Sequence, residues 1–98
     1  MQLTLIENPD NTKSVLYKLA RIVYAETLAS SLQITEAMSS MIYNIHIKYN
    51  KSFEDISNDS DLFESLNNES VRHEYLNIPI TDRKFQMCLR VLQKIMSL

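Results

Sequence analysis

One glutamate stands on the apolar face of the first helix that the sequence predicts. Leu19, Ile22 and Val23 recur at spacings of three and four residues, which is typical of the buried stripe of an amphipathic helix. At roughly 100° per residue, Glu26 falls on the same stripe. An acidic residue near the end of a stripe commonly reaches solvent or pairs with a basic neighbour. The alternative is a general acid, because a carboxyl group that loses hydration among apolar side chains holds its proton for a leaving oxygen.

Three amphipathic helices would position this glutamate. The first is predicted over about residues 12–29, with Asn11 or Thr12 as its N-cap. Thr35 is the candidate cap of the second helix and Thr81 that of the last. The apolar positions of these two helices are Met38, Met41, Ile42, Ile45 and Tyr49 in the second, and Phe85, Cys88, Leu89, Leu92, Ile95 and Met96 in the last.

The segment between the second and last helices is predicted to be irregular. Phe53 and Ile56 are its expected anchors, and a short helical turn is expected around Leu62, Phe63 and Leu66. Residues 67–79 are loop-like and end at Pro79, which cannot donate a helical hydrogen bond. We therefore predict an all-α fold of three main helices with short helical turns, in one domain over residues 1–98.

The 98 residues contain no glycine at all. Glycine-rich phosphate loops, dinucleotide-binding motifs and tight hairpins need its freedom at positive φ, so these are disfavoured together. Asparagine is the next best residue at left-handed positions. Asparagines that could serve turns or helix ends are Asn44, Asn50, Asn58, Asn67, Asn68 and Asn77.

Composition narrows the classes of partner and cofactor. Ten basic and twelve acidic residues give a net charge of -2 without a basic block, which disfavours nucleic acid. The sequence has no run of about 18 apolar residues, so no membrane span is predicted. The N-terminal residues lack the features of a signal peptide. His46 and His73 have no partners at zinc-ligand spacing, and residues 58–61 lack the glycine of a calcium loop. We expect neither a metal nor a cofactor, and a buried thiol at Cys88.

Two segments carry a resemblance to a known family. Residues 19–27 read LARIVYAET and residues 36–44 read EAMSSMIYN. They resemble the cell wall hydrolase family that includes the spore-cortex-lytic enzymes, in which L-A-x-x-V-x-x-E-A is followed by A-V-A-x-V-I-x-N-R. The matching residues are Leu19, Ala20, Val23 and Glu26 in the first segment and Ala37, Met41, Ile42 and Asn44 in the second, with Phe53, Ile56 and Phe63 where later motifs are expected.

The resemblance implies a lysozyme-like, lytic-transglycosylase-like helical fold that cleaves the β-1,4 bond between the amino sugars of bacterial peptidoglycan. The matching Glu26 would be the catalytic acid and base. Asn44, Phe63 and Tyr43 would bind the glycan strand. The family works at the cell envelope, although no signal peptide is visible in this chain.

The chain also departs from the family pattern. Where family members continue E-A-x-G-E, residues 26–30 read ETLAS and lack the glycine and the second acid. Leu62 replaces the glutamine of the Q-F pair, and the G-A-T-H-Y segment is absent. A catalytically inactive helical relative that binds glycan or protein, or that self-associates through exposed Met, Tyr and Leu side chains, is the alternative. Bound to an arginine such as Arg83 or Arg90, Glu26 would be structural.

Overall fold

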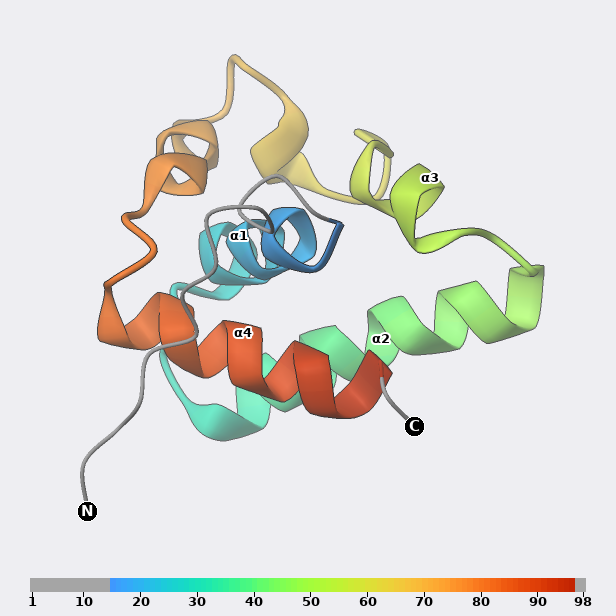
Figure 1. Cartoon of the computed structure of the whole chain (residues 1–98). Helices are drawn as coiled ribbons and strands as arrows, with labels where there is room; N and C mark the ends of the chain where they lie inside the picture. Colours follow the sequence, from blue (N-terminus) through green and yellow to red (C-terminus); the bar gives the residue numbers. More distant parts are fainter. Residues whose placement is uncertain (1–14, 97–98) are drawn as a thin grey trace.

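The computed structural model describes residues 15–96, which form helices and turns without any strand (Figure 1). The helices are α1 (Val15–Thr27), α2 (Leu32–Tyr49), α3 (Phe53–Ser57) and α4 (Arg83–Met96), with 3-10 helices η2 (Glu64–Leu66) and η3 (Val71–Asn77) between α3 and α4. The all-α prediction is confirmed for these residues. Within the same range, no helix combines the length and apolar character needed to cross a membrane.

Helix α1 lies at the centre of the molecule. It packs against α2, α3, α4, η2 and η3, and Figure 1 shows these elements arranged around it. Leu19, Ile22 and Val23, predicted as its buried stripe, are fully buried. The core continues into α2 through Ile42 and into α4 through several buried side chains, namely Phe85, Cys88, Leu89 and Leu92. One hydrophobic core therefore fixes the axis and rotation of the helix that carries Glu26.

The predicted caps of α2 and α4 are wrong by a few residues. Ser31 caps α2, because its Oγ accepts the Ile34 N–H at 3.1 Å while its backbone is extended. Thr35 instead lies in the first turn of α2, buried, with its hydroxyl donating to the Ser31 carbonyl. At α4, the Asp82 carboxylate accepts the Phe85 N–H at 3.1 Å and displaces Thr81 as the cap. The cap predicted for the first helix lies outside the described residues.

The segment predicted as a loop contains a 3-10 helix. Ser70 begins η3, with its Oγ accepting the Arg72 N–H at 3.1 Å. Two apolar assignments on α2 also need correction, since Tyr49 is 66% exposed and Met41 38% exposed. The predicted anchors are confirmed: Ile56 is buried and Phe53 packs against the core.

Left-handed backbone occurs here without glycine. Asn50 has φ 50° at the C-cap of α2, as expected for an asparagine. Leu28 and Ala29 also have positive φ, at 56° and 48°. These two residues end α1 at Thr27, before the predicted boundary at residue 29. Ala29 stands where the family that the sequence resembles has glycine. Positive φ costs an alanine roughly 1–2 kcal/mol of conformational free energy.

We predict that Ala29→Gly stabilises the protein by about 0.5–1 kcal/mol, because glycine removes the steric cost of positive φ at this turn. The matched control is Ala25→Gly, which also deletes one buried methyl group, but from a residue inside α1. That control should lower the free energy of unfolding by about 1 kcal/mol. Urea denaturation of both variants measures the contrast. Equal destabilisation by the two changes would contradict a strained turn.

A second prediction concerns Cys88. Burial raises the pKa of its thiol to about 12, against an opposing hydrogen bond with the Thr35 side chain. Between about pH 9 and about pH 12 the unfolded chain releases this proton while the folded chain keeps it, so stability falls as pH rises. Denaturation at about pH 8 and about pH 10.5 should show wild type losing about 1–2 kcal/mol more than Cys88→Ala. Identical losses would contradict the buried, protonated thiol.

Candidate active site

The carboxyl group of Glu26 lies at the C-terminal turn of α1 and points to η2. The residue is half-buried, and its Oε2 accepts the backbone N–H of Ser65 at 2.7 Å. Ser65 is fully buried and lies 39 residues further along the chain. This contact therefore joins the end of the central helix to the segment that follows α3. It also orients the carboxyl group through a fixed backbone donor.

An arginine binds the end of α1 without binding the carboxyl group of Glu26. Arg72, on η3, donates from Nη1 to the carbonyl oxygens of Ala25 at 3.1 Å and Glu26 at 2.9 Å. Its Nε lies 3.1 Å from Oε2 of Glu64. The last carbonyls of a helix need donors, and a cation there also complements the helix dipole. Among residues 15–96, no lysine or arginine forms an ion pair with the Glu26 carboxylate.

Ser65 is held from both sides of its backbone. While its N–H donates to Glu26, its carbonyl oxygen lies 2.9 Å from Nδ1 of His73. A carbonyl oxygen only accepts, so this hydrogen bond assigns a ring proton to Nδ1 of His73. The hydroxyl of Ser65 is buried without a hydrogen-bond partner in the described part of the chain. His73 thus helps to fix the donor that orients Glu26.

The other residues predicted to bind glycan differ in their exposure to solvent. Phe63 is fully buried in the core, so no face of its ring is available to a sugar, and its predicted binding role is corrected to packing. Asn44 is exposed on α2, two positions from the buried Ile42, which places it on the outer side of that helix. Tyr43 is half-buried, with its ring 6.3 Å from the His46 ring. The predicted set does not line one groove with Glu26.

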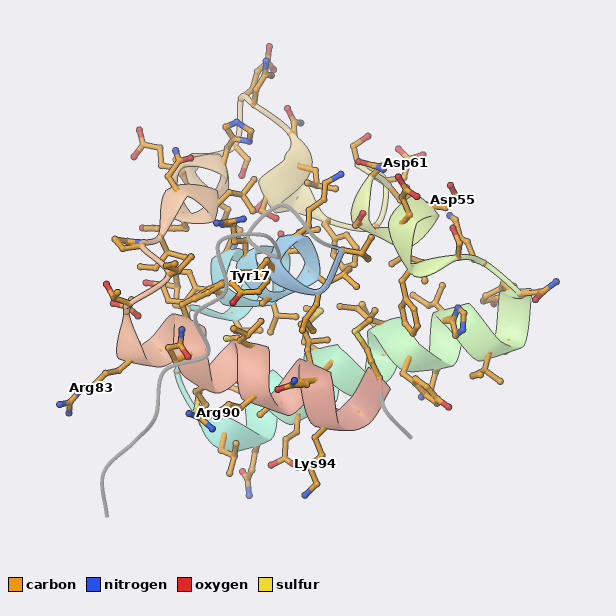
Figure 2. The ribbon with its side chains drawn as sticks, in the orientation of Figure 1. Tyr17, Asp55, Asp61, Arg83, Arg90 and Lys94 are labelled. Carbon is orange, nitrogen blue, oxygen red and sulfur yellow. The ribbon has the colours of Figure 1, made fainter. Side chains whose placement is uncertain are left out.

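Sequence reasoning missed Ser65, Arg72 and His73. Arg83 and Arg90, considered as partners for Glu26, lie on α4 instead; Figure 2 shows both apart from the turns above α1. Ser70 was the local signal for η3, because a serine often begins a helical turn. No spacing pattern connects residues 65–73 to Glu26, since this contact arises only when η2 and η3 pack on α1.

Metal ligation has no support in this part of the molecule. Within residues 15–96, no group of three or more His, Cys, Asp or Glu side chains could hold an ion. The described contact of the Glu26 carboxyl group is with one backbone donor, the Ser65 N–H.

Comparisons with protein-family models, with curated protein sequences and with solved structures find no significant match for this chain. Its function must be inferred from its own residues and their geometry.

We predict that Arg72→Met destabilises the protein by about 1–3 kcal/mol, because the carbonyls at the end of α1 lose their donor. The control is Arg83→Met, which removes an exposed arginine that Figure 2 shows directed away from the protein. It should change the free energy of unfolding by less than about 0.5 kcal/mol. Chemical denaturation measures both values. Equal effects would show that Arg72 does not hold the end of α1.

Proposed function

We propose that this chain cleaves the β-1,4 bond between the amino sugars of peptidoglycan as a lytic transglycosylase, with Glu26 as general acid and base. The observation that carries the proposal is the state of the Glu26 carboxyl group. Glu26 is half-buried in the last turn of the central helix, and the Ser65 N–H orients its carboxyl group. Arg72 binds the backbone carbonyl of Glu26 and not its carboxyl group. A catalytic carboxyl group needs such orientation without permanent neutralisation by a cation.

The hydrogen bond from Ser65 assigns separate roles to the two carboxyl oxygens. An N–H only donates, so Oε2 is the acceptor, and we assign the transfer of the proton to Oε1. In the proposed reaction, Oε1 gives this proton to the glycosidic oxygen as the bond to the anomeric carbon breaks. The carboxylate then takes the proton of the sugar's 6-hydroxyl, whose oxygen bonds to the anomeric carbon. Glu26 is regenerated, and the product is a 1,6-anhydro sugar.

The helical arrangement is compatible with a small lysozyme-like domain, which is part of the same proposal. A central helix with a glutamate in its last turn, and 3-10 helices packed against that helix, supports this part of the proposal. Peptidoglycan is the implied partner, and the cell envelope is the implied place of action.

The second candidate is a non-catalytic module that binds glycan or protein. The Glu26–Ser65 hydrogen bond favours it as well, because a carboxylate that joins α1 to η2 can serve stability alone. Exposed apolar side chains on α2, namely Leu32, Ile34, Met41 and Ile47, would suit a protein partner or a second copy. Cleavage of cell walls distinguishes the two candidates.

The test is a turbidity assay on purified cell walls with mass spectrometry of the soluble products. We predict that wild type releases anhydro-muropeptides and that Glu26→Gln reduces the rate by at least about 100-fold. Glutamine keeps an oxygen for the Ser65 N–H, so the variant should fold normally by circular dichroism. Glu36→Gln, which changes an exposed carboxylate on α2, is the control and should keep wild-type activity. Absence of cleavage by wild type would leave the non-catalytic module.

Glu64 provides a check on the single-acid mechanism. Its carboxylate is paired with Arg72, and Glu64 directly precedes Ser65, so it is a candidate for a second catalytic carboxyl group. Hydrolysis with two carboxyl groups would make both essential and would yield a reducing sugar. Under the proposed mechanism, Glu64→Gln keeps the anhydro product. Loss of cleavage in that variant together with a reducing-end product in wild type would replace transglycosylation by hydrolysis.

A further inference from the structure

A polar hollow adjoins the segment that orients Glu26. It has a volume of about 480 Å³ and is lined by Ser60, Asp61, Leu66, Asn67 and Asn68. This volume is within the range of sites that bind small ligands. Figure 2 shows Asp61 on the turn that follows α3, on the same side of the molecule as η2.

Backbone hydrogen bonds fix the walls of the hollow. The Asp61 N–H donates to the Asp59 carboxylate at 3.0 Å, and the Glu69 N–H donates to the Asn67 side-chain oxygen at 3.1 Å. Asp59 is itself anchored by Lys51 at 2.6 Å. The turns before and after η2 are therefore ordered by their own side chains, which reduces the entropy lost on binding.

The hydrogen-bonding groups that line the hollow remain available to a ligand. In residues 15–96, the side chains of Ser60, Asp61 and Asn68 have no hydrogen-bond partner, and the Asn67 amide group keeps its N–H donors because its oxygen is the atom in use. Leu66 adds a half-buried apolar surface. The hollow thus offers amide donors, a carboxylate acceptor and one apolar contact.

We propose that this hollow is a binding subsite for an N-acetylated amino sugar of the glycan strand. An acetamido group has a carbonyl that accepts from Asn67 or Asn68, an N–H that donates to Asp61, and a methyl group that packs on Leu66. A sugar with a hydroxyl in its place lacks both the carbonyl and the methyl group. The ligand class rests on the proposed function, whereas the polar character of the hollow does not.

The subsite includes the residue that follows Ser65, the residue that orients the proposed catalytic acid. Leu66 follows Ser65 directly, and adjacent Cα atoms are about 3.8 Å apart. The Ser65 N–H contacts Oε2 of Glu26 at 2.7 Å. A sugar seated in the hollow would therefore lie beside the residue that holds the acid, and η2 would link recognition to positioning.

The experiment measures binding in the full-length Glu26→Gln variant, so that cleavage plays no part. Tetra-N-acetylchitotetraose is titrated into isotope-labelled protein, with cellotetraose as the competitor that lacks acetamido groups. We expect the amide signals of Asn67 and Asn68 to shift with the acetylated ligand, and cellotetraose to bind at least about 10-fold more weakly, because two polar groups of the site lose their partners.

Variants made on the same background identify the groups responsible. Asp61→Ala and Asn68→Ala should each weaken binding by about fivefold or more, as expected for one lost hydrogen bond. Asn77→Ala, which changes an exposed asparagine at the end of η3, is the matched control and should leave affinity unchanged.

Binding and cleavage can fail separately in this design. Binding at the hollow without any wall cleavage by wild type would retain the subsite and reject the catalytic proposal. Wall cleavage with no shifts at the hollow, or with equal binding of both oligosaccharides, would reject the subsite and retain the catalysis. Absence of any binding would likewise overturn the subsite.

Discussion

The organisation of the molecule depends on the hydrogen bonds made at the C-terminal end of α1. A helix that ends inside a protein leaves carbonyl groups without partners, and here Arg72 satisfies two of them from η3. Ser65 adds a second connection by donating its N–H to the Glu26 side chain. Both donors come from residues 64–73, so the segment between α3 and α4 is held against α1 by polar contacts made at one place. The apolar core fixes α1, and these polar contacts fix the segment between α3 and α4.

The hydrogen bonds at the end of α1 also explain why the turn after this helix can be strained. Leu28 and Ala29 adopt positive φ without glycine, which persists only where surrounding contacts fix the backbone. Those contacts lie at the end of α1 and at the turn itself. The Thr27 hydroxyl donates to the Val23 carbonyl and accepts the Ala29 N–H, while Arg72 holds the carbonyls of the preceding residues. Ala29 itself is buried, so its methyl group contributes packing that offsets part of the conformational cost.

Periodicity predicts the three main helices because their apolar residues repeat over several turns. These residues are largely buried in α1 and α4, whereas Ile42 is the one member of the predicted α2 set that is fully buried. Periodicity is less informative about helix ends, where a single side chain such as Asp82 or Ser31 decides the boundary against an equally suitable neighbour. The sequence predicts a loop at η3 because most of its residues are exposed and show no buried stripe. The contacts of η3 with α1, among them those of Arg72, form only in the folded chain. The burial of Phe63 and the outward position of Asn44 likewise depend on packing, although the two-residue offset of Asn44 from Ile42 already indicated opposite faces of α2.

The division of labour between helices and turns follows from these contacts. Helices α1 and α4 supply most of the buried apolar side chains. Residues 59–73 supply donors and acceptors around Glu26 and the hollow. Polar groups that bind ligands commonly lie in turns, because the backbone N–H and C=O groups of a turn are not all hydrogen-bonded within the turn. Such turns are precise only when something rigid holds them. Here the rigid part is α1, and the same carboxyl group that we propose to act on substrate is one of the groups that hold the turns. Substitutions at Glu26 therefore alter chemistry and architecture together unless, as with glutamine, the acceptor for Ser65 is kept.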